Sequence, residues 1–192
     1  MTTEGLQQEE ARVARLARHT FTRGLSHRHL VLLADSAITT RFRPGEKIFR
    51  AGERADRFYL IESGEVVLES GSDRSKPVVI QTIGAGDVLG WSWMMPPYQW
   101  QFTARATQPT EALHFLGSIL HEYCERDHSL GFELHKRMSA VMMKRLQAAR
   151  RKMVSINAER ERLEPASALP PLLEQECDRN DSCAKGFREE AD

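Results

Sequence analysis

The sequence has no long apolar run and only three cysteines among its 192 residues. No segment approaches the about 20 consecutive apolar residues that a membrane-spanning helix needs, so we expect no contact with a membrane. The first ten residues are polar and charged, and they lack the apolar stretch of a secretory signal peptide. Cys124, Cys177 and Cys183 are odd in number and far apart, which predicts neither a disulfide framework nor a zinc site. We therefore expect a cytoplasmic protein.

The sequence also lacks net charge, and its central part lacks histidine. Lys and Arg number 27, as do Asp and Glu, so the overall charge indicates no nucleic-acid partner. No histidine occurs between residues 41 and 112. A cupin-type metalloenzyme needs two or three histidines and a carboxylate that converge inside a β-barrel, so this class is excluded. Because no motif of nucleophilic catalysis or phosphate binding is present either, the sequence predicts a protein that is not an enzyme and holds no metal.

Short β-rich runs separated by turn residues dominate the middle of the chain. Two amphipathic helices are expected before them, at residues 6–18 and 27–37. From Arg41 onward, glycine and proline punctuate the pattern, and Gly64 lies where a hairpin requires a positive φ. Evenly spaced short strands between turns predict a β-sandwich, a barrel or a jelly roll. The expected strands are 47–50, 58–61, 66–69, 78–83 and 110–115.

A helical pattern follows after about residue 117. We expect Ser129 to cap a long helix, because serine is a preferred N-cap residue. Apolar residues then recur in steps of three or four as far as Ile156, which predicts one helix of about 30 residues with a single apolar face. Such a helix is longer than one small roll can cover, so we predict that it pairs with a second copy in a homodimer. The alternative is that it packs only on its own roll. The residues expected in the dimer helix are Leu134, Met138, Met142, Leu146, Ala149 and Met153.

The composition changes abruptly after Leu163. Residues 164–192 hold eight acidic and three basic residues, a net charge of −5, and predict a disordered tail. Residues 136–163 hold nine basic and two acidic residues, a net charge of +7, so the tail can screen the helix. We expect four segments. These are an N-terminal helical extension (1–19), a β-roll with its entry helix (20–128), a long helix (129–163) and the acidic tail (164–192).

The run from Phe42 to Val66 closely resembles the cyclic nucleotide-binding family. It reads FRPGEKIFRAGERADRFYLIESGEV and fits the family pattern F-x-x-G-E-x-I-x-x-x-G-x-x-A-D-x-x-Y-x-I-x-x-G-x-V. The likeness extends over residues 20–156, where Lys144-Arg145-Leu146-Gln147 is similar to the long helix of Crp/Fnr-type bacterial sensors. The resemblance implies a mainly β fold with flanking helices. It consists of an eight-stranded cyclic-nucleotide-binding β-roll (a double-stranded β-helix, or jelly roll) followed by a long C-terminal helix, with the ligand between them.

Family members that bind cyclic nucleotides carry a short phosphate-binding cassette after a Gly-Asp turn. A glycine and the following backbone N–H groups cradle the cyclic phosphate, a glutamate accepts from the ribose hydroxyl, and an arginine pairs with the phosphate. Here the glycine corresponds to Gly90, the glutamate position to Trp91, and the arginine position to Trp100 or a neighbour. No basic residue occurs between Gly86 and Ala104.

Arg105 does not replace the missing arginine, and the long helix also departs from the family pattern. Arg105 is five residues beyond Trp100, so on one extended strand it would point to the opposite face. The small hydroxyl residues that some bacterial sensors place on the long helix correspond here to Ala148-Ala149-Arg150. Burying a phosphate without its cation costs several kcal/mol. We therefore expect cyclic AMP and cyclic GMP to bind weakly, or not at all, in the family's usual manner.

The aromatic residues of the altered cassette leave two interpretations open. Their rings either fill the former pocket as core, or line a reshaped pocket for a flat and less anionic ligand. Arg150 is either a replacement cation or a solvated helix charge. No cofactor is assigned, and the candidate ligands are a cyclic nucleotide or another small aromatic molecule. The candidate ligand-binding residues are Gly90, Trp91, Ser92, Trp93, Trp100, Gln101 and Arg150.

These observations predict a homodimeric, non-catalytic regulatory or sensor module whose long helix moves against the roll. One alternative is a ligand-free scaffold that binds a protein partner through exposed tryptophans or the helix. Others are a Crp/Fnr-family transcription regulator or a true cyclic AMP-binding protein. Regulators of that type carry a helix-turn-helix domain after the long helix. The 29 residues after Leu163 are too few for one, so we expect no sequence-specific nucleic-acid recognition.

Overall fold

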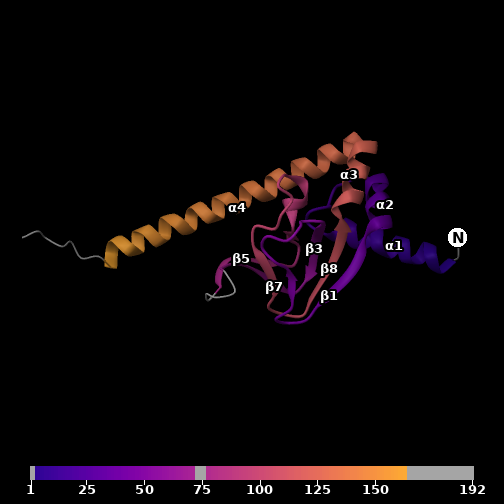
Figure 1. Cartoon of the computed structure of the whole chain (residues 1–192). Coiled ribbons are helices and arrows are strands. Elements are labelled where there is room, and N and C mark those ends of the chain that lie inside the picture. Colours follow the sequence, from indigo (N-terminus) through magenta and orange to yellow (C-terminus); the bar gives the residue numbers. More distant parts are fainter. Residues whose placement is uncertain (1–2, 72–76, 164–192) are drawn as a thin grey trace, which may run out of the picture. The chain divides into compact units, whose positions relative to one another are not determined.

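The computed structural model describes residues 3–71 and 77–163, and its central feature is a pair of four-stranded antiparallel sheets (Figure 1). One sheet has the order β1 (Ile38–Phe42), β8 (Thr110–Leu116), β3 (Arg57–Ser63) and β6 (Val88–Leu89). The other has the order β2 (Lys47–Phe49), β7 (Thr103–Ala106), β4 (Glu65–Ser70) and β5 (Val78–Gly84). The helices are α1 (Thr3–Arg18), α2 (His27–Ser36), the 3₁₀ helix η1 (Trp91–Met94), α3 (Gly117–Arg126) and α4 (His128–Leu163). The expected mainly β roll with flanking helices and a long helix is confirmed.

The chain divides into two units. Residues up to Arg145 form one compact unit, and the second begins at Leu146. Within the first unit, strand β3 is buried on both faces, which explains its uninterrupted apolar run. Phe58 and Leu60 face the helices, whereas Tyr59 and Ile61 face the other sheet.

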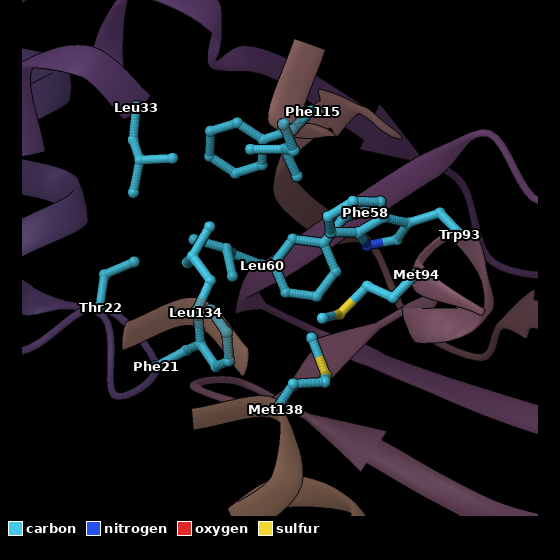
Figure 2. A pocket seen from close by; sticks show the side chains of 11 residues that line it. Phe21, Thr22, Leu33, Phe58, Leu60, Trp93, Met94, Phe115, Leu134 and Met138 are labelled. Atoms are coloured by element: carbon cyan, nitrogen blue, oxygen red, sulfur yellow. The ribbon is translucent and has the colours of Figure 1, made fainter. Parts of the chain in front are cut away.

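The core therefore consists of two clusters. We call the one between the sheets the inter-sheet cluster. Its buried members are Phe49, Ala55, Tyr59, Ile61, Val66, Leu68, Ile83, Leu89, Trp100, Ala104 and Ala112. We call the other the helix-side cluster (Figure 2), in which the outer face of β3 and β8 packs against the helices. Its largest fully buried side chains are Leu16, Leu33, Leu60, Leu113, Phe115, Leu120, Leu130 and Met138.

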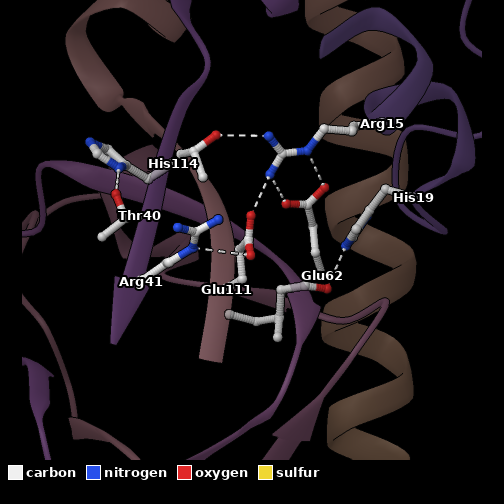
Figure 3. Close-up of polar contacts among 9 residues, drawn as sticks. Arg15, His19, Thr40, Arg41, Glu62, Glu111 and His114 are labelled. Atoms are coloured by element: carbon white, nitrogen blue, oxygen red, sulfur yellow. Dashed lines mark hydrogen bonds and ion pairs between the residues drawn. The ribbon is translucent and has the colours of Figure 1, made fainter. Parts of the chain in front are cut away.

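Helix α1 is bound to the roll through a set of ion pairs (Figure 3). Arg15 pairs with Glu62 at the end of β3 and, at 3.2 Å, with Glu111 of β8. Just after α1, buried His19 places its Nε2 3.1 Å from the carbonyl oxygen of Ile61. Burial lowers the pKa of His19, so the ring is held neutral at this contact. The first predicted helix thus has a specific anchor that its sequence pattern did not indicate.

Two local predictions have different outcomes. Gly64 has a φ of 85°, as the hairpin requires, and a methyl group there would lie 2.4 Å from the carbonyl oxygen of Pro109. The prediction that Ser129 caps the long helix is wrong, because α4 already begins at His128. The cap is Asp127, whose Oδ1 accepts from the backbone N–H groups of Ser129 and Leu130 at 3.1 and 3.2 Å. These bonds and the Ser129 hydroxyl hold the pKa of Asp127 below its ordinary value.

The strand predictions are confirmed for five strands, and three were missed. Strand β6 has only two residues, and β7 is a four-residue strand after an irregular segment, so neither shows an alternating pattern. Strand β1 begins at Ile38, before Arg41, where the β-rich pattern was expected to start. The predicted disorder of residues 164–192 lies outside the described residues.

Candidate functional site

The cassette (residues 86–106) begins with a tight turn that the end of β3 fixes. The N–H of Gly86 donates to the carbonyl oxygen of Ile61 at 2.8 Å, and the N–H of Ile61 donates to that of Asp87 at 3.0 Å. After β6, Gly90 adopts a left-handed conformation with a φ of 85° and starts the 3₁₀ helix η1. The Pro96–Pro97 peptide bond is cis. The backbone turn that the resemblance implies is therefore present around Gly90.

Trp100 occupies the space directly against Gly90. Its side chain is only 4% exposed and stacks on Phe49, with ring centroids 3.9 Å apart and an interplanar angle of 13°. A methyl group at Gly90 would lie 2.9 Å from the Trp100 ring. The Trp100 backbone also donates to Glu53 and accepts from Gly52, at 2.9 and 2.8 Å. Ring and backbone are thus both fixed in the position where the resemblance places a phosphate-binding arginine.

The other predicted cassette residues are distributed over different surroundings. Trp93 is buried in the helix-side cluster, and half-buried Trp91 packs against the same cluster. Ser92 is half-buried, and its carbonyl oxygen accepts from the N–H of Met95 at 3.4 Å. Gln101 is exposed and donates to the carbonyl oxygen of Gln99 at 3.3 Å. The predicted site residues therefore do not converge on one pocket.

Arg105 is engaged away from the cassette glycine. The expectation that Trp100 and Arg105 share one extended strand is wrong, because the chain bends at residues 101–102 and β7 begins at Thr103. The guanidinium of Arg105 pairs instead with the buried carboxylate of Glu69 on β4. This pairing raises the pKa of Arg105. Its charge is thus already matched by a carboxylate within the sheet.

Arg145 is a residue near the cassette whose contact the sequence did not indicate. Its guanidinium on α4 donates to the carbonyl oxygen of Val88 in β6. Burial lowers the pKa of Arg145, and the neighbouring carboxylate of Asp87 partly opposes this. Lys144 lies 3.9 Å from the same carboxylate. Since Lys144 and Arg145 are adjacent in a stretch rich in basic residues, no sequence pattern separated half-buried Arg145 from its exposed neighbour.

The predicted dimer residues divide according to burial. Leu134 and Met138 are buried in the helix-side cluster of their own unit, and Met142 packs half-buried against it. The side chains of Leu134, Met138 and Met142 are thus covered at least in part within one chain. In the second unit, the large apolar side chains Leu146, Met153 and Ile156 are exposed. Ala149 and Arg150 are exposed in the same helix.

Neither a cluster of metal ligands nor a membrane-spanning helix occurs in the described part of the chain. There, no group of three or more His, Cys, Asp or Glu side chains could hold a metal ion. Across the same residues, no helix combines the length and the apolar character that crossing a bilayer requires.

Comparison with known proteins agrees with this geometry. Residues 39–127 match the model of the cyclic nucleotide-binding domain. This segment is therefore similar to the cyclic nucleotide-binding domain family. Its assignment agrees with the two antiparallel sheets, the Gly86–Gly90 turn and the helices after β8. The matching family is a regulatory binding domain, and no catalytic family is indicated.

Similar proteins include an uncharacterized protein and a cGMP-dependent protein kinase. The chain is 39% identical over 80 residues to an uncharacterized protein of Mycobacterium tuberculosis, a match that spans 42% of the chain and 15% of that protein. It is 32% identical over 87 residues to a cGMP-dependent protein kinase of Eimeria tenella, spanning 45% of the chain and 8% of the kinase. The chain therefore covers only a small part of these relatives.

One match to a solved structure covers almost the full length of the other protein. A putative cyclic nucleotide-binding protein from Geobacter metallireducens is 27% identical, with a TM-score of 0.61, and the match covers 76% of this chain and 99% of that one. The chain thus carries a cyclic nucleotide-binding regulatory fold.

Proposed function

We propose that the chain is a non-catalytic regulatory or sensor module that does not hold a cyclic nucleotide in the family's usual manner. It works as a cytoplasmic homodimer, in which displacement of α4 relative to the roll is the output. The observation that carries this proposal is the contact between Trp100 and Gly90. An indole fills the space that a cyclic phosphate would need above the cassette glycine.

The charge around the cassette supports the same conclusion. Cyclic phosphate burial requires a cation, because an unpaired buried anion costs several kcal/mol. Arg105 is neutralised by Glu69, and Arg145 donates to a backbone carbonyl beside Asp87. Neither guanidinium is free to take over the role of the missing arginine without giving up an existing partner.

The dimer part of the proposal rests on the second unit. Leu146 and Met153 are 47% and 64% exposed, and they are seven residues apart on one helix, as in a coiled-coil seam. Ala149 lies three residues after Leu146 and four before Met153, so it falls on the same stripe. A second copy of the same helix is the simplest partner that buries this stripe.

A scaffold that binds a protein partner is the second candidate. It is not favoured by the tryptophans, since Trp93 and Trp100 are buried. It is favoured by strand β5, which lies at the edge of its sheet and exposes Val78, Val79 and Ile80. An apolar edge strand with unpaired backbone groups can accept an extended peptide.

Thermal unfolding with and without millimolar cyclic AMP or cyclic GMP tests the nucleotide part. A ligand at 100 times its Kd stabilises by about 2.7 kcal/mol, which raises Tm by roughly 5–10 °C for a chain of this size. We expect no rise for the natural chain. Trp100→Arg is the matched variant, because a guanidinium there supplies the phosphate with a cation, and for it we expect a rise. A rise for the natural chain contradicts the proposal.

Sedimentation equilibrium tests the dimer part. The natural chain is expected to sediment as a dimer, and Met153→Glu as a monomer, because the substitution places a charge in the apolar stripe. Ser155→Glu is the control, since Ser155 is an exposed polar residue of the same helix turn. A natural chain that remains monomeric at all concentrations removes this part of the proposal.

A further inference from the structure

Trp93 carries a buried hydrogen-bond donor that has no acceptor. Its side chain is 4% exposed, and its Nε1 is buried without a hydrogen-bond partner. The ring is nevertheless well held, with His121 packed edge-on at a centroid distance of 4.9 Å. Leaving such a donor unsatisfied is destabilising, because it loses its hydrogen bonds to water without gaining a replacement. A well-fixed, buried indole N–H without an acceptor indicates that an acceptor belongs to this position.

The same tryptophan lines a cavity within the helix-side cluster. Figure 2 shows the indole nitrogen on the side of the ring that faces Phe58 and Met94. The cavity has a volume of about 10 Å³, at most the space of one water molecule, so a larger molecule enters only when Met94 and Met138 move aside. Its walls are contributed by the outer face of the β1–β8–β3–β6 sheet, η1, α2, α3, α4 and the segment after α1. The lining side chains are Phe21, Thr22, Leu33, Phe58, Leu60, Trp93, Met94, Phe115, Leu120, Leu134 and Met138.

The chemistry of this lining defines what fits. Apart from Trp93, the only polar side chain is that of Thr22, and its hydroxyl already donates to the carbonyl oxygen of Leu16. A buried water needs two to four polar partners, so water is poorly held here. No charged side chain lines the cavity, which excludes an ionic ligand. Met94 and Met138 are flexible, unbranched side chains that can turn aside to enlarge the space.

We propose that this cavity binds a small, uncharged, mainly apolar molecule that has one hydrogen-bond acceptor and accepts from Nε1 of Trp93. The ligand lies between η1 of the cassette and α4, because Trp93 and Met94 form one wall and Leu134 and Met138 another. Entry of the ligand moves the Met138 side chain, so binding changes the packing of α4. The site is on the helix side of β3, whereas the Trp100–Gly90 contact is between the sheets. The inference therefore holds whether or not the roll binds a cyclic nucleotide.

NMR of the ¹⁵N-labelled full chain tests the proposal with two probes of similar shape. Acetophenone carries one carbonyl acceptor, and ethylbenzene carries none. The three indole N–H signals are assigned from single Trp→Phe variants. We expect acetophenone to move the Trp93 signal downfield in a saturable way, while the Trp100 signal stays in place. Ethylbenzene is expected to produce no downfield shift. An unmoved Trp93 signal up to the solubility limit of acetophenone, or equal movement of the Trp93 and Trp100 signals, overturns the proposal.

Variants of the methionines test where the probe lies. Met138→Ala enlarges the cavity and is expected to tighten acetophenone binding roughly tenfold, or about 1.4 kcal/mol. Met94→Ala enlarges the cavity from the cassette side and replaces Met138→Ala in this test if that variant does not fold. Met143→Ala is the control, because Met143 is a 54% exposed methionine of the same helix, and it is expected to change nothing. If the cavity variants leave the affinity unchanged, or Met143→Ala alters it equally, the site is elsewhere.

Discussion

The two buried tryptophans of the cassette occupy opposite faces of β3 and differ in how completely they are used. Trp100, between the sheets, stacks on Phe49 and presses against Gly90, so the space beside the cassette glycine is filled. Trp93, on the helix side, is just as buried but leaves its N–H without an acceptor beside a cavity. Trp100 therefore fills the space beside Gly90, which under the proposed function is the place of the family's ligand, whereas Trp93 borders a small cavity.

This difference indicates that burial alone does not distinguish core from site. Both residues are 4% exposed, and both belong to apolar clusters. They differ in whether the indole N–H has an acceptor and whether the space around the ring is filled. The cassette thus contributes packed core on one side of β3 and an unpartnered N–H group on the other.

The largest expected effect comes from emptying the filled side. Trp100→Ala removes a fully packed indole and leaves a cavity above Gly90, so it should lower the free energy of unfolding by about 3–5 kcal/mol. Chemical denaturation of the variant and the natural chain measures this. A loss below about 1 kcal/mol means that the ring is not part of the core, and the account of the filled site is then wrong.

An intermediate effect is expected from the guanidinium that joins α4 to β6. Arg145→Ala removes the hydrogen bond to Val88 and leaves that carbonyl oxygen without its partner. Because part of the guanidinium remains in contact with solvent, we expect a loss of about 1–2 kcal/mol in denaturant unfolding. Lys144→Ala, which changes an exposed neighbour, should stay within about 0.5 kcal/mol. Equal losses in both variants would show that Arg145 is an ordinary solvated charge.

A smaller effect on stability is expected from removing the unpartnered indole N–H of Trp93 on the helix side of β3. Trp93→Phe deletes the orphan N–H but also reduces the apolar volume, and these changes oppose each other. The net change in unfolding free energy should therefore be about 1 kcal/mol or less, far below that of Trp100→Ala. The same denaturation experiment compares them. A cost as large as that of Trp100→Ala would remove the asymmetry between the two sides.

The smallest expected effect is a change in pH dependence at His19, which bonds to β3 itself. Burial lowers the pKa of His19 in the folded chain, so below about pH 6.5 the unfolded chain takes up a proton that the folded chain resists. Stability from this group is present above pH 6.5 and falls as the pH drops toward the lower folded pKa. Unfolding measured between about pH 7 and 5 should show a shallower fall for His19→Gln than for the natural chain. Part of the fall should remain, because burial also lowers the pKa of His114. Identical profiles would show that His19 does not resist protonation.

The fold could be predicted from the sequence because its signals are local or strongly spaced. Gly64 requires its positive φ, and the uninterrupted apolar run Phe58–Ile61 fits a strand buried on both faces. The glycines and apolar positions from Phe42 to Val66 carried the family resemblance. The strands that were missed are those too short or too irregular to form a pattern, such as β6.

The site could be predicted only in part, because its properties depend on where the side chains point rather than on which residues are present. The resemblance aligned the family's arginine with Trp100 or a neighbour but left open whether the aromatic rings fill or line the pocket. It offered no means of separating Arg145 from Lys144, which differ only in the face of α4 that they occupy. The orphan Nε1 of Trp93 depends on what its neighbours lack, which no sequence pattern records.

The central claim is that the indole of Trp100 holds the place beside Gly90 against a cyclic nucleotide. Nuclear Overhauser effects between the Trp100 ring protons and the Gly90 α-protons measure this contact directly, with and without millimolar cyclic AMP. The account predicts strong effects that cyclic AMP leaves unchanged. Loss of these effects, together with new ones between Gly90 and the ribose of cyclic AMP, would contradict it.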